Sequence, residues 1–117
     1  MTVWSSTTDA DLVPYPEDDA LVVDGDVRAG MAVLRDTHED GVSLLTGIWS
    51  ASPSTLEMAF EGDETIVVLE GSAHVTVGDI DVFLSPGTTA SFKPGGRAMW
   101  HIPEPFKQFF VLVSRAH

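Results

Sequence analysis

Two carboxylates and one imidazole are the candidates for acid/base chemistry in this chain: Glu57, Glu64 and His101. Carboxylates and imidazoles move protons in many enzymes because their surroundings can bring their pKa values close to neutral pH. A carboxyl group among apolar side chains has its pKa raised by desolvation, which suits it to act as a general base. We therefore predict Glu57 or Glu64 as the base and His101 as the acid or orienting group. The reaction would be of the isomerase, cyclase, epimerase or lyase type.

Large apolar residues near these positions are predicted to form the walls of an apolar ligand pocket. They are Trp49, Met58, Phe60, Met99 and Trp100. A pocket of Met and aromatic side chains with one or two acids is typical of small-molecule sites, and the expected partner is a small-molecule ligand or substrate. Large apolar residues also belong in any core. The alternative is therefore a non-catalytic protein that binds a small molecule or serves as a scaffold.

Other chemistries lack the residues that they need. The chain has no cysteine, which excludes disulfides, thiolate metal sites and thiol nucleophiles. No serine lies in a Gly-x-Ser-x-Gly pattern, and the glycines form no phosphate loop. The other histidines, His38, His74 and His117, are far apart, so the sequence offers no histidine pair at ligand spacing.

Short β-prone runs separated by turn residues must position these side chains. The runs are 21–23, 30–35, 42–49, 64–69, 73–77, 80–84 and 106–113, with a further strand between Gly87 and Pro94, and 36–41 is predicted as a loop. Gly71 and Gly87 are expected to adopt positive φ where strands reverse, and Pro94 with Gly96 to make a tight turn. Strands with this spacing predict a β-sandwich or barrel.

Two of these strands are apolar without alternation, at Ile66–Leu69 and Phe109–Val113. In a strand with one solvated face, apolar and polar residues should alternate, whereas a strand covered on both faces can be apolar throughout. A second subunit is the simplest cover for the outer faces. We therefore predict a homodimer that depends on these faces, with Phe110 as the position to test.

Composition sets the broader expectations. The chain has 117 residues, the size of one domain, and a net charge of -12 with a pI near 4.3. Such a charge repels a phosphate backbone, so nucleic acid is not an expected partner. No run of about 20 apolar residues is present, so neither a membrane nor secretion is expected, and we predict a cytoplasmic protein. Residues 1–19, with two prolines, are predicted as an N-terminal arm before a barrel domain of residues 20–117.

Two segments resemble the paired signature motifs of cupins: Glu64-Thr-Ile-Val-Val-Leu-Glu-Gly71 and Pro94-Gly-Gly-Arg-Ala-Met-Trp-His101. Further matching features follow in order: Asp24-Gly25, Gly47-Ile-Trp49, Ser52-Pro53, Gly87, Pro105-x-Lys107 and Phe109-Phe110. From about Val22 to Val113 the chain resembles the small single-cupin family that includes the domains of ureidoglycine aminohydrolase and the ethanolamine-utilisation cupin. The resemblance implies an all-β fold, a jelly-roll antiparallel β-barrel in a single domain.

The metal ligands of that family are largely absent from the matching positions. With Glu64 aligned to the family's glutamate, Glu57 and Ala59 occupy two histidine positions, and Met99 occupies the third. A one-residue slip would instead put Met58 and Phe60 at the first two. We therefore expect no metal and no other cofactor. Glu57, Glu64 and His101 still contain the donor types of a facial iron site. A metal-dependent, ureidoglycine aminohydrolase-like enzyme thus stays open as a further alternative.

Overall fold

Residues 1–14 and 20–115 are described in the computed structural model, except for the side chains of residues 20–22. The boundary predicted between the arm and the barrel, at residue 19, lies outside the described residues. The regular structure within them consists of strands, with no helix, so the all-β prediction is confirmed. It follows that they include no helix with the length and apolarity needed to cross a membrane.

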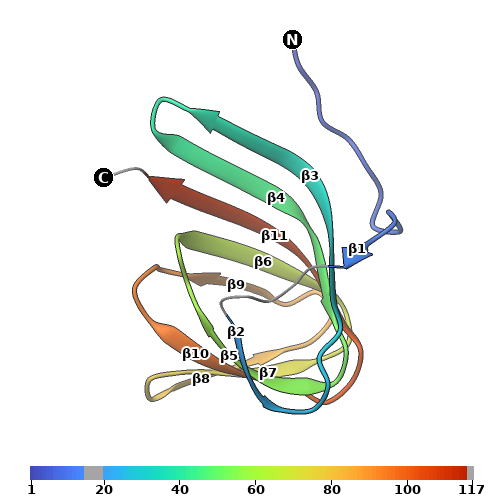
Figure 1. Ribbon diagram of the computed structural model, residues 1–117, viewed down its shortest axis with the longest axis vertical. Helices are drawn as coiled ribbons and strands as arrows, with labels where there is room; N and C mark the ends of the chain where they lie inside the picture. Colours follow the sequence, from blue (N-terminus) through green and yellow to red (C-terminus); the bar gives the residue numbers. More distant parts are fainter. Residues whose placement is uncertain (15–19, 116–117) are drawn as a thin grey trace.

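The strands form two sheets that curve toward each other and enclose a common interior (Figure 1). One sheet has six strands in the order β1 (Val13–Pro14), β3 (Ala29–Glu39), β4 (Val42–Ala51), β11 (Phe106–Arg115), β6 (Asp63–Glu70) and β9 (Thr89–Phe92). The other has five, in the order β2 (Ala20–Asp24), β5 (Ser54–Ala59), β10 (Arg97–Ile102), β7 (Ala73–Val77) and β8 (Ile80–Leu84). All pairings are antiparallel, as in the predicted jelly roll.

Aromatic side chains fill much of the space between the sheets. The rings of Trp49, Trp100 and Phe106 meet edge to face, with centroids 6.1 to 6.3 Å apart. Phe60 and Phe92 stack in parallel at 4.6 Å. All five are buried in one apolar core cluster. Edge-to-face and offset arrangements are the favoured geometries for aromatic rings, so these five rings stabilise one another between the two sheets.

The hairpin between β3 and β4 is longer than predicted. The predicted loop 36–41 is wrong over its first four residues, because β3 continues to Glu39, which pairs with Val42. The turn itself is confined to Asp40 and Gly41, both at positive φ, 52° and 75°. Pairing with the full length of β4 outweighs the local turn preference of the polar residues in this segment.

Glycines mark several strand reversals. Gly71 and Gly87 have φ of 79° and 89°, which confirms the prediction for both. In the 94–96 turn the residue at positive φ is Gly95, at 101°, and not Gly96. The turn is closed by hydrogen bonds that join Gly95 N to Phe60 O and Phe60 N to Gly96 O.

Candidate functional site

Two of the three predicted catalytic residues lie on the outer face of the five-stranded sheet. Burial alternates along β10, so that Trp100 and Ile102 face the core while His101 is exposed. His101 Nδ1 lies 3.1 Å from the hydroxyl oxygen of Thr55 on β5. On the same outer face, Arg97 donates from Nε to Glu57 Oε1 at 2.7 Å. Glu57 and His101 therefore point away from the barrel interior.

Glu64 lies on the inner side of the other sheet. It has the same parity along β6 as Ile66 and Val68, which are both buried. Its cross-strand partners are Phe92 on β9 and Leu112 on β11, and its side chain is half-buried between these strands. The structure thus separates Glu64 from Glu57 and His101 by the opposite sheet, and the three do not converge on one reacting group.

The predicted pocket residues divide in the same way. Trp49, Phe60 and Trp100 belong to the buried core, and Met58 packs against it. Met99 does not line the interior, because it lies on the outer face with 37% of its surface exposed. The strand period explains the division, since neighbouring residues of a strand face opposite ways.

Gln108 is an interior polar residue that the sequence analysis missed. It lies on β11 between the buried Phe106 and Phe110 and is itself only 4% exposed. Among the described residues, both Gln108 Oε1 and Trp100 Nε1 are buried without a hydrogen-bond partner. Gln108 is the cross-strand partner of Trp49, whose ring centroid lies 6.3 Å from that of Trp100. Among the described residues, the interior therefore offers an unpartnered acceptor, Gln108 Oε1, and an unpartnered donor, Trp100 Nε1, beside aromatic rings.

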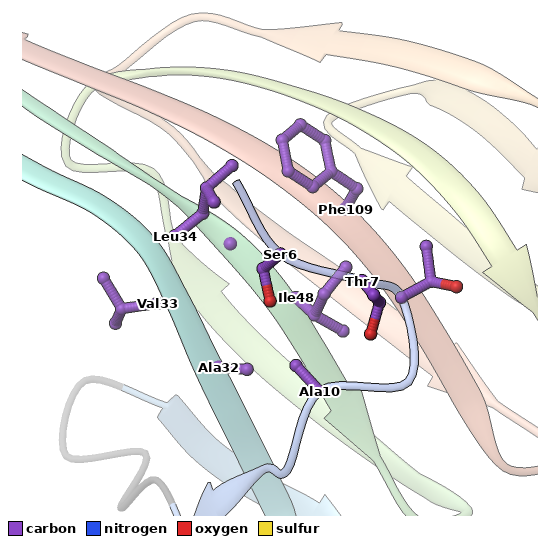
Figure 2. Close-up of a pocket in the computed structure, with 10 residues that line it drawn as sticks. Ser6, Thr7, Ala10, Ala32, Val33, Leu34, Ile48 and Phe109 are labelled. Atoms are coloured by element: carbon purple, nitrogen blue, oxygen red, sulfur yellow. The ribbon is translucent and has the colours of Figure 1, made fainter. Parts of the chain in front are cut away.

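A separate small cavity of about 130 Å³ lies outside the barrel, between the N-terminal segment and the six-stranded sheet. Figure 2 shows Ser6 and Thr7 on one side of it and Ile48 and Phe109 on the other. No titratable side chain contributes to its walls. The cavity is therefore not a site for acid/base chemistry.

Comparison with known proteins places the chain in a family. Residues 37–110 match the EutQ-like cupin domain. The chain is a member of this cupin family. This confirms the resemblance to the ethanolamine-utilisation cupins and supports a small-molecule cupin. No protein of curated function matches the sequence.

Solved structures agree with the cupin fold. EutQ from Salmonella typhimurium is 22% identical, with a TM-score of 0.63 over 77% of this chain and 72% of its own. EutQ from Clostridium difficile is 19% identical, with a TM-score of 0.64 over 86% of this chain and 79% of its own. An acetylacetone dioxygenase from Acinetobacter johnsonii is 14% identical, with a TM-score of 0.74 over 96% of this chain and 74% of its own. Identities this low establish the fold alone.

The first cupin motif can be aligned with this chain in two ways that differ by one residue. The side chains that face the barrel interior decide between these two alignments. On β5 the residue with its side chain in the core is Leu56, at 0% exposure, and Met58 and Phe60 share its parity. The one-residue slip is therefore the alignment that matches the structure, and Glu57 and Ala59 face outward. On β10 the inward residues are Ala98, Trp100 and Ile102.

These inward side chains do not fit the metal that cupins commonly hold. Met58, Phe60, Ala98 and Trp100 offer no imidazole or carboxylate donor, which leaves Glu64 as the inward carboxylate of the motifs, whereas a divalent metal in such a barrel needs several imidazole and carboxylate ligands. Within the described part of the chain, no group of three or more His, Asp or Glu side chains is placed to hold a metal ion.

Proposed function

We propose that this cupin is a non-catalytic, metal-independent protein that binds a small uncharged molecule inside its barrel. The observation that supports this proposal is a buried donor, Trp100 Nε1, and a buried acceptor, Gln108 Oε1, which both lack a hydrogen-bond partner in the interior. A buried polar group that lacks a partner costs about 1–3 kcal/mol, and a bound molecule that pairs with it recovers that cost. Specificity in small-molecule sites comes from a few such groups in an apolar wall.

The positions of the acids and histidine favour binding over acid/base catalysis. A general base and a general acid must both lie within hydrogen-bond reach of the reacting group. Glu57 and His101 are on the solvent side of the five-stranded sheet, and Glu64 is on the inner side of the six-stranded sheet. A molecule in the interior can therefore meet at most one of these three side chains.

The interior groups define the chemistry of the ligand. The Trp100 indole N–H donates, so the ligand needs an acceptor, and the Gln108 carbonyl accepts, so the ligand needs a donor. The surrounding rings of Trp49 and Phe106 favour a flat, weakly hydrated group. A primary amide carries a carbonyl acceptor and N–H donors on one plane. An ionised ligand would lose its hydration without a compensating charge at these two groups.

Titration with matched small molecules tests the proposal. We expect propionamide to shift the indole N–H resonance of Trp100 in NMR spectra and to raise the melting temperature, whereas propionate should do neither. Trp100→Phe removes the donor and Gln108→Met removes the acceptor, and each should abolish the response. Met99→Leu, on the outer face, is the control and should respond like the parent. Equal responses to propionate, or no response of the parent to any neutral amide tried, would contradict the proposal.

A further inference from the structure

Strand β8 is an edge of the five-stranded sheet, and its outer border is open. It pairs with β7 over its whole length, Ile80–Leu84, without a register shift. Among the described residues, no other strand pairs with β8, and no backbone hydrogen bond reaches its second side (Figure 1). This side therefore presents unpaired N–H and C=O groups, which form a template for one more strand.

The other three sheet borders carry features that oppose the addition of a strand. β1 has two residues and ends in Pro14, which has no N–H. β9 has four residues and is followed by Lys93-Pro94. The pairing of β2 with β5 is irregular between Val22 and Asp24. Short strands, prolines, lysines and bulges are the usual protection of sheet edges. β8 has no lysine, proline or bulge, and its charged residue is Asp81.

Two large apolar side chains are exposed along this edge. Phe83, at 71%, is the most exposed aromatic side chain in the described part of the chain, and Ile80 is 61% exposed. The Phe83 ring stacks on the imidazole of its cross-strand partner His74, with the ring centroids 4.5 Å apart. The ring is thus held upright on the outer face of the sheet. Covering it with another apolar side chain would bury its exposed surface at a gain in free energy.

Asp81 lies on the same face as Phe83, because the two are two residues apart on one strand. His74 donates from Nε2 to Asp81 Oδ1 at 2.8 Å, and the Thr76 hydroxyl donates to the same oxygen at 3.2 Å. Both of these bonds end on Oδ1, which leaves Oδ2 to accept from a cation. Side chains that are ordered before binding lose less entropy when a partner arrives.

The charges at this edge select a basic partner. Residues 72–92 contain Asp79 and Asp81 and no lysine or arginine, in a chain with a net charge of -12. A second copy seated on β8 would bring another Asp79 and Asp81 to the same border, and like charges on adjoining strands are destabilising. A segment rich in lysine or arginine would instead be attracted by the whole molecule.

We propose that an extended, basic segment of a different protein adds to β8 as a further strand of this sheet. In antiparallel pairing, the more stable kind, its residues opposite Phe83 and Asp81 are two apart and share the outer face. The first should be aromatic and the second lysine or arginine. The residue between them faces the side of Val82 and should be apolar. The pattern recognised is therefore aromatic, apolar, basic, read along the partner segment.

A blocked peptide of sequence Thr-Tyr-Val-Lys-Val-Thr tests the proposal. We expect it to shift the amide resonances of residues 80–84 in NMR spectra. With glutamate in place of its lysine, binding should weaken about five- to thirtyfold, because an attractive charge pair becomes a repulsive one. Phe83→Ala should weaken binding about two- to fivefold. Absence of binding at about 1 mM peptide, or equal binding of both peptides, would overturn the proposal.

A charge reversal on the protein identifies the residue that selects the partner. Asp81→Lys should reverse the preference, so that the glutamate peptide binds better than the lysine peptide. Asp36→Lys is the matched control, since Asp36 and Asp81 are both 55% exposed and both lie beside a histidine. It changes the net charge equally and should keep the preference of the parent, with circular dichroism to check both folds. The same preference in the two variants would mean that overall charge, and not this edge, attracts the peptide.

Strand pairing also has a backbone signature. Neighbouring residues of a strand direct their N–H groups to opposite sides, so N-methylation of the tyrosine or of the adjacent valine of the peptide should block binding in one case and not in the other. Equal effects of the two methyl groups would rule out addition to β8. Light scattering detects the competing occupant, a second copy. A different mass for Asp81→Lys than for the parent would show that another copy covers this edge, against the proposal.

Discussion

Two adjacent residues, Met99 and Trp100, face opposite sides of one sheet and should respond very differently to truncation. Trp100 is 1% exposed and contacts Trp49, Phe92 and Phe106, whereas Met99 is 37% exposed. We expect Trp100→Ala to lower the free energy of unfolding by about 3–5 kcal/mol, through lost burial and a cavity. Met99→Ala should change it by about 0.5 kcal/mol or less. Urea denaturation measures both, and similar losses would contradict the assignment of the two faces.

The inward residues also predict the metal content of the purified protein. Met58 and Phe60 occupy the inward positions of the first motif and Trp100 an inward position of the second, and none of these side chains is a ligand for a divalent metal. Protein prepared without a histidine tag should therefore contain far less than one equivalent of iron, manganese or zinc by elemental analysis. One full equivalent that disappears in Glu64→Ala would show that the barrel holds a metal after all.

The sequence identified residues that could do chemistry, but it did not show which face of a strand each of them occupies. Glu64 could be placed from its motif, and the structure puts it on the inner side. Glu57 and Met99 could not, because a single-residue shift along a strand reverses every side chain. Gln108 carries no motif, but it alternates with Phe106 and Phe110 at the period of a strand, which is the signal that identifies it in hindsight.

At the scale of strands and turns, two glycines with similar backbone conformations should differ in their tolerance to alanine. A Cβ at Gly71 would lie only 2.1 Å from Pro105 O, whereas a Cβ at Gly87 would have no neighbour within 4 Å. Gly87→Ala should cost about 1–2 kcal/mol, the strain of an L-residue at positive φ. Gly71→Ala adds a clash with backbone and should cost clearly more. Thermal or urea unfolding of both variants makes the comparison, and equal losses would count against the close approach of the 105–106 backbone.

The positions of the strands were largely predictable from the sequence. For a strand that is apolar throughout, however, the sequence could not show which side chains face the core and which face outward. Two predicted runs, 73–77 and 80–84, coincide with β7 and β8, because Gly71 and the Gly78-Asp79 turn bound them sharply. The 109–113 run has no polar residue to reveal its alternation. Phe110, chosen from the sequence as the position to test the dimer, is 3% exposed in the interior, and the outward residue is Phe109. An aspartate at position 110 would damage the core before it reported on any interface.

For the molecule as a whole, the charge of -12 should make stability depend on salt in a defined direction. The fold has a radius of gyration of 14.0 Å, so charges on all its faces repel one another at low ionic strength, where the Debye length is about 30 Å at 0.01 M. Unfolding separates these charges and relieves the repulsion. Salt should therefore stabilise the folded state, by on the order of 1 kcal/mol between 10 and 150 mM NaCl.

Ion pairs would make added salt destabilise the fold, because salt weakens the attraction between their opposite charges. Among the described residues, the ion pair between an arginine and an acidic side chain joins Arg97 and Glu57. Both side chains are partly exposed, so this pair contributes only about 0–1 kcal/mol to the stability of the fold. Repulsion should therefore prevail. Urea denaturation is the suitable assay because urea is uncharged, with light scattering to hold the association state constant. Near pH 4.3, where the net charge approaches zero, the slope of stability against salt should vanish. A fall in stability with added salt at pH 7 would mean that specific ion pairs, and not the overall acidic charge, govern this fold.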